Sequence, residues 1–311
     1  MNKRVNLIIG SGVLGAYLSA ELLKKREKVI VTSRSLKKKF TNYKYLKIKK
    51  KIKFEKLNTN ESKQIKNIIE KYNPNKIFYF SGQSSLTKSI ENKKETLISH
   101  YNGTKNFLDI LKKQKLDIKF FKANSGYIFL PNNGLVDLSC SFSQNNNPYI
   151  KAQQKVFSLI KKYRKFGLNL SSLVFMQIES PLRKNDFFIK KVCLGAKYRK
   201  KIIVGNLSTL RDYSWITDIV KAIILTSNLK SQDYFISAGK KLSGLEIIKT
   251  AYKLNKLDHR KYVSTNKKFF RKKEDKCLVG SNKNSLYLRK KYNFSFNIFG
   301  KKLIKEMYKN L

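Results

Sequence analysis

The sequence predicts an α/β protein with a doubly wound parallel sheet, because short apolar runs alternate with amphipathic segments along the first 176 residues. Buried parallel strands are typically near-continuous apolar runs, whereas the helices between them repeat their apolar residues with a helical period. The chain has 311 residues, of which 41% are hydrophobic, enough to bury a sizeable core. This length favours one large domain with a smaller lobe over two independent domains.

The expected elements follow this alternation in order. Strands are expected at Val5–Ile9, Lys28–Thr32, Ile48–Leu57, Lys76–Phe80, Ile118–Ala123 and Leu168–Phe175. Helices are expected at Ala16–Lys25, Ser62–Tyr72, Leu97–Leu111 and Pro148–Tyr163. The apolar run at 5–9 ends in glycines, and Pro74 follows the end of the 62–72 helix, as expected at a helix boundary. Strands that alternate with helices in this way form parallel sheets with helices on both faces.

After residue 176 the pattern changes to shorter, mixed elements. We therefore expect residues 1–176 to form the main domain and residues 177–311 to form a smaller, discontinuous C-terminal substrate lobe. A helix at Asp218–Ser227 is expected to return the chain to the main domain, within a segment of about 212–240.

A glycine pattern follows the first expected strand. Gly10, Gly12 and Gly15 form G-x-G-x-x-G between that strand and the next helix. In this position the glycines allow a tight turn and close approach of a pyrophosphate, which the helix N-terminus also attracts. The pattern predicts a Rossmann-type domain that binds NAD(P). The alternative is a glycine-rich turn that binds no ligand.

The end of the second expected strand indicates which cofactor is bound. An acidic residue there binds the ribose of NAD, whereas a basic residue accepts the 2′-phosphate of NADP. The sequence is Thr32-Ser33-Arg34-Ser35, without an acid, which favours NADP, with NAD as the other possibility. Alternatively, Arg34 is one more surface cation in a lysine-rich chain.

The charge balance is strongly basic, with 68 Lys and Arg against 20 Asp and Glu. Such a charge could serve nucleic-acid binding. However, the lysines are spread along the whole chain, and their abundance together with Asn and Ile is typical of compositional drift. We therefore expect no specific nucleic-acid partner. The three cysteines lie far apart, so neither a disulfide framework nor a metal site is expected, and the cytoplasm is the expected compartment. No membrane span is expected, because polar residues and glycines interrupt the apolar stretch after Arg4.

Several segments occur in an order that is typical of one family. They are Ser81–Glu91, Gly103–Leu108 (GTKNFL), Pro148–Tyr149, Gln177–Arg183 (QIESPLR), Val204–Tyr213 (VGNLSTLRDY), and Phe270, Arg271 and Glu274 followed by Gly280. In these segments the chain resembles the extended short-chain dehydrogenase/reductases, also called the NAD-dependent epimerase/dehydratase family. Within that group it most resembles the GDP-mannose 4,6-dehydratases. The resemblance covers nearly the whole chain, and the QIESPLR turn is its most specific part.

The resemblance implies an NAD(P)-dependent enzyme that oxidises the C4 hydroxyl of a nucleotide-linked sugar. In such enzymes a tyrosine takes the hydroxyl proton, and a serine or threonine hydrogen-bonds the same oxygen. A lysine one helical turn after the tyrosine binds the nicotinamide ribose and brings the tyrosine pKa, about 10 when free, toward working pH. By position, Tyr149 matches the tyrosine and Ser125 matches the serine or threonine.

The resemblance also implies the ligand contacts. Cofactor contacts fall on Gly10, Gly12, Gly15, Arg34, Ser35, Ser81, Gly82, Gln83, Ser84, Tyr149 and Arg183. Substrate contacts fall on Gln177, Asn206, Arg211 and Arg271, and the two arginines would bind the diphosphate through charge-assisted hydrogen bonds. The implied partners are a nucleotide-diphosphate sugar and further copies of the chain, in a homodimer or homotetramer.

The chain departs from the family pattern at catalytic positions. The residue one turn after Tyr149 is Gln153 instead of lysine, and Tyr127 stands where the dehydratases carry a glutamate that takes the C5 proton. The first family glycine falls on Ile9, and the acid expected near the adenine appears as Lys56, with Asn58 close by.

Three functions remain open on these grounds. The first is an active epimerase or reductase on a nucleotide sugar, which needs no glutamate. The second is a full 4,6-dehydratase with substituted groups. The third is a catalytically impaired homologue that keeps the fold and binds NADP and nucleotide sugars. In the first case Gln153 could still hydrogen-bond the ribose, although it carries no charge.

Overall fold

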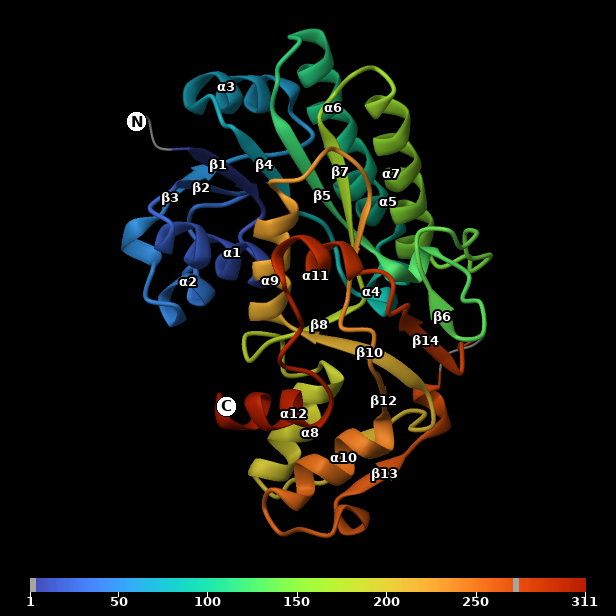
Figure 1. Cartoon of the computed structure of the whole chain (residues 1–311). Coiled ribbons are helices and arrows are strands. Elements are labelled where there is room, and N and C mark those ends of the chain that lie inside the picture. Colours follow the sequence, from blue (N-terminus) through green and yellow to red (C-terminus); the bar gives the residue numbers. More distant parts are fainter. Residues whose placement is uncertain (1–3, 271–273) are drawn as a thin grey trace. The chain divides into compact units, whose positions relative to one another are not determined.

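The computed structural model describes residues 4–270 and 274–311 (Figure 1). The chain divides into two compact units. The first unit comprises residues 1–128, 142–174 and 223–234, and the second comprises 129–141, 175–222 and 235–311.

A seven-stranded sheet with the order β11-β7-β5-β4-β1-β2-β3 organises the first unit. Its strands are β1 (Val5–Ile9), β2 (Lys28–Ser33), β3 (Lys53–Lys56), β4 (Lys76–Tyr79), β5 (Lys119–Ser125), β7 (Leu170–Phe175) and β11 (Tyr234–Ile236), the last of which straddles the unit boundary. β1 pairs in parallel with both β2 and β4, and β2 with β3 and β4 with β5 are also parallel. The strand order therefore reverses between β1 and β4, which is where open α/β sheets bind ligands.

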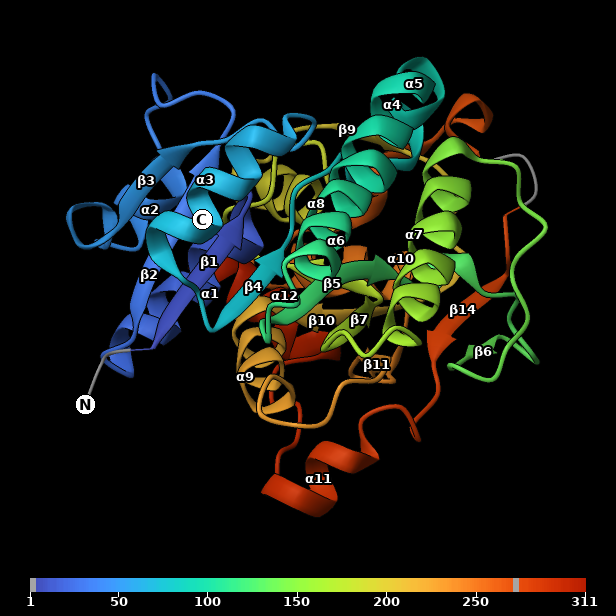
Figure 2. The ribbon, with the colours of Figure 1, turned by 90° about the horizontal axis from the view of Figure 1, so that it is seen from above.

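Helices cover both faces of this sheet, as the sequence predicts. They are α1 (Val13–Lys24), α2 (Thr41–Tyr45), α3 (Ser62–Tyr72), α4 (Leu86–Glu91), α5 (Lys93–Leu97), α6 (Gly103–Lys113) and α7 (Pro148–Arg164), with single turns η1 (Lys49–Lys51), η2 (Ile98–Asn102) and η3 (Gly126–Ile128). Figure 2 shows α6 and α7 running side by side along one face, and α3 packs against α6 on that same face. Helix α1 lies on the opposite face, where the Gly15 backbone approaches the side chain of Ile8.

The main core lies between the sheet and helices α3, α6 and α7. Leu7, Ile77 and Phe120 face these helices from three neighbouring strands and are fully buried. Ile65 of α3 and Val156 of α7 close the layer from the helix side. Side chains on a strand point alternately to the two faces, so residues next to these, such as Ile8, pack on the other side.

Two expected elements are wrong in detail. The segment Ile48–Leu57 is not one strand, because Lys49–Lys51 form a 3₁₀ turn and only Lys53–Lys56 pair with β2. The expected helix Leu97–Leu111 is interrupted, because Ile98–Asn102 form a π-helical turn before α6 begins at Gly103. Such π turns add a residue to a helix and are frequent at functional sites. Neither break has a proline signal in the sequence.

The second unit is a mixed assembly of short strands and helices. Its strands are β6 (Leu135–Val136), β8 (Gln177–Glu179), β9 (Ile202–Val204), β10 (Leu210–Trp215), β12 (Lys241–Ser243), β13 (Val263–Thr265) and β14 (Cys277–Gly280). Its helices are α8 (Phe188–Lys197), α10 (Gly244–Lys253), α11 (Leu286–Tyr292) and α12 (Gly300–Lys309), and α9 (Ile216–Thr226) straddles the unit boundary. β10 is the central strand and pairs with β8, β12 and β14.

Candidate functional site

The glycine loop connects β1 to α1 at the reversal point of the sheet. Gly10 has a φ of +110°, and a Cβ there would lie 2.9 Å from the backbone nitrogen of Ser81, the residue that follows Phe80 beyond β4. A Cβ at Gly15 would lie 2.5 Å from the Gly10 carbonyl oxygen, so this glycine lets α1 pack on the loop. Gly12 is the N-cap of α1, and a Cβ added there would have nothing within 4 Å. Two glycines are thus fixed by packing, while the third leaves room for a ligand.

A second close approach occurs just beyond β4. Gly82 has a φ of +137°, and a Cβ there would collide with the ring of His100. The His100 Nε2 lies 2.7 Å from the Gln83 carbonyl oxygen, and the His100 ring meets the Tyr149 ring edge-on with centroids 5.7 Å apart. The π turn that carries His100 therefore joins the segment 81–84, predicted to bind the cofactor, to the predicted catalytic tyrosine.

Tyr149 is held by the first turn of α7. The Asn147 side chain accepts a hydrogen bond from the Tyr149 backbone N–H at 3.0 Å, and Pro148 occupies the first helical position. Both are typical of a helix N-terminus. The Asn147 Nδ2 also donates to the Leu86 carbonyl at 3.1 Å, which joins α7 to the start of α4. Tyr149 itself is half-buried.

Ser125 ends β5 next to the same helix. Its backbone N–H donates to the Asn124 side chain at 2.8 Å, and the Asn124 Nδ2 donates to the Gln153 carbonyl oxygen at 3.2 Å. Gln153 is only 3% exposed, and its Oε1 is buried without a hydrogen-bond partner. Tyr127, at the predicted position of the dehydratase glutamate, donates its backbone N–H to the Ser125 Oγ at 3.3 Å. The predicted residues Ser125 and Gln153 are thus brought together through Asn124.

Two buried titratable groups share this part of the first unit. Burial lowers the pKa of Lys122 to about 7. Burial, and next the charge of Lys122, lower the pKa of His100 to about 3, so the imidazole is neutral. Because a carbonyl can only accept, His100 must donate its Nε2–H to Gln83. Its Nδ1 is therefore an acceptor, and it is buried without a partner.

Arg34 directly follows β2, where the sequence places the cofactor-selecting residue. Its guanidinium pairs with Glu95 at 3.1 Å, and both side chains are largely exposed. An exposed pair of this kind is worth less than about 1 kcal/mol, so a phosphate could readily compete for Arg34. Ser35 is half-buried and accepts a hydrogen bond from the Lys37 backbone.

The other predicted residues that the structure describes belong to the second unit. Gln177 on β8 stands opposite Tyr213 of β10. Arg183 stacks on the Phe187 ring, with its Cζ 3.5 Å from the centroid, and Asn206 accepts hydrogen bonds from Ser208. Arg211 is 5% exposed and forms an ion pair with Glu274 at 3.0 Å. Arg271 lies outside the described residues.

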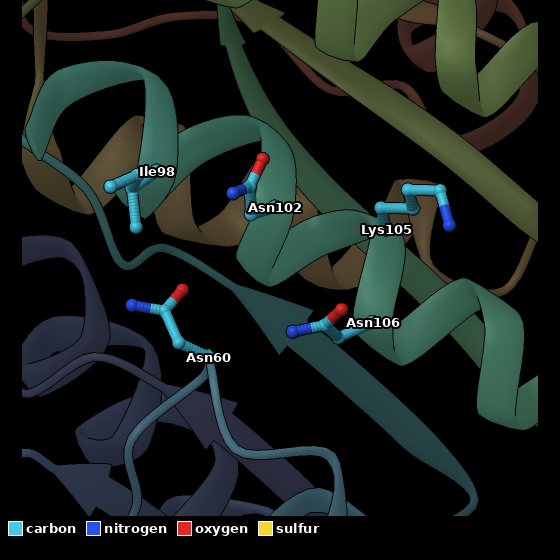
Figure 3. A pocket seen from close by; sticks show the side chains of 5 residues that line it. All are labelled: Asn60, Ile98, Asn102, Lys105 and Asn106. Atoms are coloured by element: carbon cyan, nitrogen blue, oxygen red, sulfur yellow. The ribbon is translucent and has the colours of Figure 1, made fainter. Parts of the chain in front are cut away.

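An open polar cavity of about 570 Å³ lies elsewhere in the first unit. Figure 3 shows Asn60 on the loop after β3, opposite side chains from η2 and α6; the lining residues are Asn60, Ile98, Asn102, Lys105 and Asn106. None of the predicted site residues lines it. Among residues 4–270 and 274–311, no helix is long and apolar enough to cross a membrane, and no group of three or more His, Cys, Asp or Glu could hold a metal.

Comparison with known proteins assigns the chain to a family. Residues 7–307 match the family described as GDP-mannose 4,6 dehydratase. The chain belongs to the GDP-mannose 4,6 dehydratase family. It is 22% identical over 231 residues to GDP-mannose 4,6 dehydratase 1 of Arabidopsis thaliana, covering 71% of this chain and 64% of that protein. The chain thus spans somewhat less than two thirds of the length of that relative.

Solved structures of the wider family of nucleotide-sugar dehydratases and epimerases share the fold. A dTDP-glucose 4,6-dehydratase from Bacillus anthracis in complex with NAD has a TM-score of 0.83 at 16% identity, covering 98% of this chain and 96% of that chain. A UDP-glucose 4-epimerase from Thermus thermophilus in complex with NAD has a TM-score of 0.81 at 16% identity, covering 98% and 99%. This member of the GDP-mannose 4,6 dehydratase family therefore shares the Rossmann-type fold of these two structures.

Four residues of the candidate site were not predicted from the sequence. They are His100, Lys122, Asn124 and Asn147. One signal for Lys122 was present, since a lysine inside the apolar run IKFFKA is unusual for a buried strand. His100 carried no such signal, because a π turn cannot be recognised from periodicity alone.

Proposed function

We propose that this chain is an NADP(H)-dependent enzyme that acts at the C4 hydroxyl of a nucleotide-diphosphate sugar, as an epimerase, dehydratase or reductase. The observation that carries the proposal is the pair of close backbone approaches at the reversal point of the sheet. Gly10 against Ser81 and Gly82 against His100 bring the ends of β1 and β4 together and leave open space at Gly12. This arrangement fits a dinucleotide at the α1 N-terminus.

The residues present fit such a cofactor. The loop 10–15 would hold the pyrophosphate, Arg34 would face the 2′-phosphate, and segment 81–84 would line the middle of the molecule. The unpartnered Nδ1 of His100 and Oε1 of Gln153 are buried acceptors that a ligand would satisfy. When bound, the oxidised nicotinamide would accept a hydride from the sugar carbon.

The protein side chains would manage the proton. Tyr149 would take the proton of the C4 hydroxyl, and Ser125 would hydrogen-bond the same oxygen. The hydrogen bonds of Asn147 and Asn124 hold these two residues in place from α7 and β5. Gln177, Arg183, Asn206 and Arg211 of the second unit are proposed ligand contacts, and Arg271 is proposed as a further contact.

A second candidate is a binding protein that keeps the cofactor site without turnover. Two observations favour it: the neutral Gln153 occupies the helix position one turn after Tyr149, and Tyr127 occupies the position of the dehydratase glutamate. Both candidates predict cofactor binding, and they differ in whether the sugar changes.

Incubation of the purified protein with NADP⁺ and GDP-mannose, followed by mass spectrometry and sugar analysis, separates these functions. Loss of water identifies a dehydratase, and an unchanged mass with altered stereochemistry identifies an epimerase. An unchanged sugar in a protein that binds NADP⁺ supports the binding protein. Parallel incubation with UDP-glucose tests the nucleotide and the sugar. Light scattering on the same sample tests the proposed homodimer or homotetramer.

A further inference from the structure

Lys122 is a lysine buried in β5. Its side chain is 1% exposed, and its Nζ donates to the neighbouring Ala123 carbonyl at 2.9 Å and lies 5.0 Å from the Tyr79 ring centroid. Among residues 4–270 and 274–311, no carboxylate forms a salt bridge with it. Burial of an unpaired charge destabilises a fold. Stability therefore does not explain a lysine at this position.

The strand register places Lys122 toward α7. Lys122 stands opposite Tyr79 in the parallel pair of β5 and β4, and alternation puts Lys122 and Asn124 on the same face of β5. Asn124 is about 7 Å further along the strand and hydrogen-bonds the Gln153 backbone. Lys122 and the buried Gln153 thus belong to the same layer between β5 and α7.

The Lys122 ammonium and the Gln153 amide oxygen in this layer have complementary hydrogen-bonding capacity. An ammonium can only donate, and an amide oxygen can only accept. Among the described residues, the Lys122 Nζ has one acceptor, the Ala123 carbonyl, whereas the Gln153 Oε1 has no partner. A hydroxyl group both accepts and donates, so one hydroxyl would satisfy both side chains at once.

We propose that Lys122 and Gln153 together bind a ribose hydroxyl of the nicotinamide cofactor, with the Lys122 ammonium donating to its oxygen and Gln153 accepting its hydrogen. Lys122 would thereby supply from β5 the positive charge that α7 lacks at Gln153. The inference rests on the proposed function, because it needs the cofactor to occupy the site next to Gly82 and Tyr149.

The environment of Lys122 predicts a proton signature of this binding. The groups that face it are His100 from η2 and Tyr79 from β4, and Tyr149 of α7 contacts His100. His100 is neutral, and burial holds the pKa of Lys122 at about 7. A hydroxyl that accepts from the ammonium, together with the negative diphosphate, would favour the charged form. Binding at pH 8 should therefore take up protons.

Titration calorimetry with NADPH and NADH at pH 8, in two buffers of different ionisation enthalpy, measures this uptake. The wild-type protein should take up roughly half a proton or more per site. Lys122→Met should abolish the uptake and weaken binding about tenfold. Lys76→Met is the matched control. Lys76, the first residue of β4, is also a buried lysine of this sheet, but its Nζ already donates hydrogen bonds to Ser227 and Asn228. This variant should take up as many protons as the wild type.

Moving the lysine from position 122 to position 153 tests whether the two residues act together. The double variant Lys122→Met/Gln153→Lys should recover most of the lost affinity, whereas Gln153→Met should add little to Lys122→Met. If Lys122→Met fails to fold, Lys122→Gln replaces it, and the wild-type measurement needs no variant.

Three outcomes would overturn the inference. Tight binding without proton uptake, or equal uptake in Lys122→Met, would refute the role of Lys122 and leave the proposed function standing. Absence of NADPH and NADH binding in the wild type would refute both.

Discussion

The two halves of the candidate site in the first unit, the β1–α1 loop and the β5–α7 side, differ in the interactions that determine their structure. At the β1–α1 loop, glycines are required because the backbone of one segment touches another, as where a Cβ at Gly15 would meet the Gly10 carbonyl at 2.5 Å. At the β5–α7 side, polar side chains form the candidate site, where Gln153 carries no charge and both Gln153 and Lys122 are buried. Close backbone contacts tolerate few substitutions, whereas a charged side chain can be supplied by either of two neighbouring elements. The first half should therefore resist change and the second should tolerate rearrangement.

The largest expected effect comes from the β5–α7 half. Tyr149→Phe should lower turnover of a nucleotide sugar by about 10²–10⁴-fold, as for loss of an acid–base group, while NADPH affinity and thermal stability change little. Steady-state rates, binding titration and a melting curve on the same sample measure this. Tyr198→Phe is the control and should keep the wild-type rate, because Tyr198 is exposed and lies outside the candidate site. Equal losses in both variants would remove Tyr149 from its proposed role.

The glycine loop is tested by a matched pair of substitutions. Gly15→Ala should cost about 3 kcal/mol of folding free energy, because its Cβ meets a backbone oxygen that cannot move aside. Gly12→Ala has nothing within 4 Å of its Cβ and should keep the stability of the wild type. Because that Cβ would point into the proposed pyrophosphate site, it should still weaken NADPH binding about tenfold. Denaturant unfolding and fluorescence titration separate the two effects; an unchanged affinity in Gly12→Ala would place the ligand elsewhere.

The pH dependence of stability tests whether burial destabilises the charged form of Lys122. Its folded pKa of about 7 lies below its ordinary value of 10.5, so between these values the unfolded chain binds more protons and stability rises with pH. Lys122→Met should therefore be more stable than the wild type at pH 6. This advantage should shrink by about 2 kcal/mol as the pH rises from 7 to 9. Unfolding curves across this range measure the difference, and a constant difference would show that Lys122 does not titrate there.

The smallest expected effect concerns cofactor choice. Arg34→Ala should reduce the preference for NADPH over NADH about fivefold, because the guanidinium is exposed and would contact the 2′-phosphate in a solvated setting. Glu95→Gln releases Arg34 from its ion pair and should keep or slightly raise the preference. Binding titrations with both cofactors measure the ratio. If the wild type already prefers NADH, the assignment of Arg34 is wrong.

Much of the first unit was predictable from local pattern. The helix Ser62–Tyr72 matches the structure at both ends, and the strand Val5–Ile9 does as well. The strand expected at Ile48–Leu57 was too long, because the 3₁₀ turn at Lys49–Lys51 offers no local signal. The π turn at Ile98–Asn102 was missed for a different reason, since it places His100 against Gly82 and Gln83, which are 18 and 17 positions away in the sequence.

The sequence by itself determined the alternation of strands and helices, the glycine loop at 10–15 and the missing lysine at Gln153. These features are local, because periodicity, glycine spacing and helical turns depend on neighbouring residues. Only the tertiary structure decided that Lys122 is buried beside α7, that His100 is neutral, and that the Gln153 amide oxygen has no partner. These properties depend on β4, β5, η2 and α7 meeting in space. Burial, which sets the cost of a charge, is a property of that packing and not of any single segment.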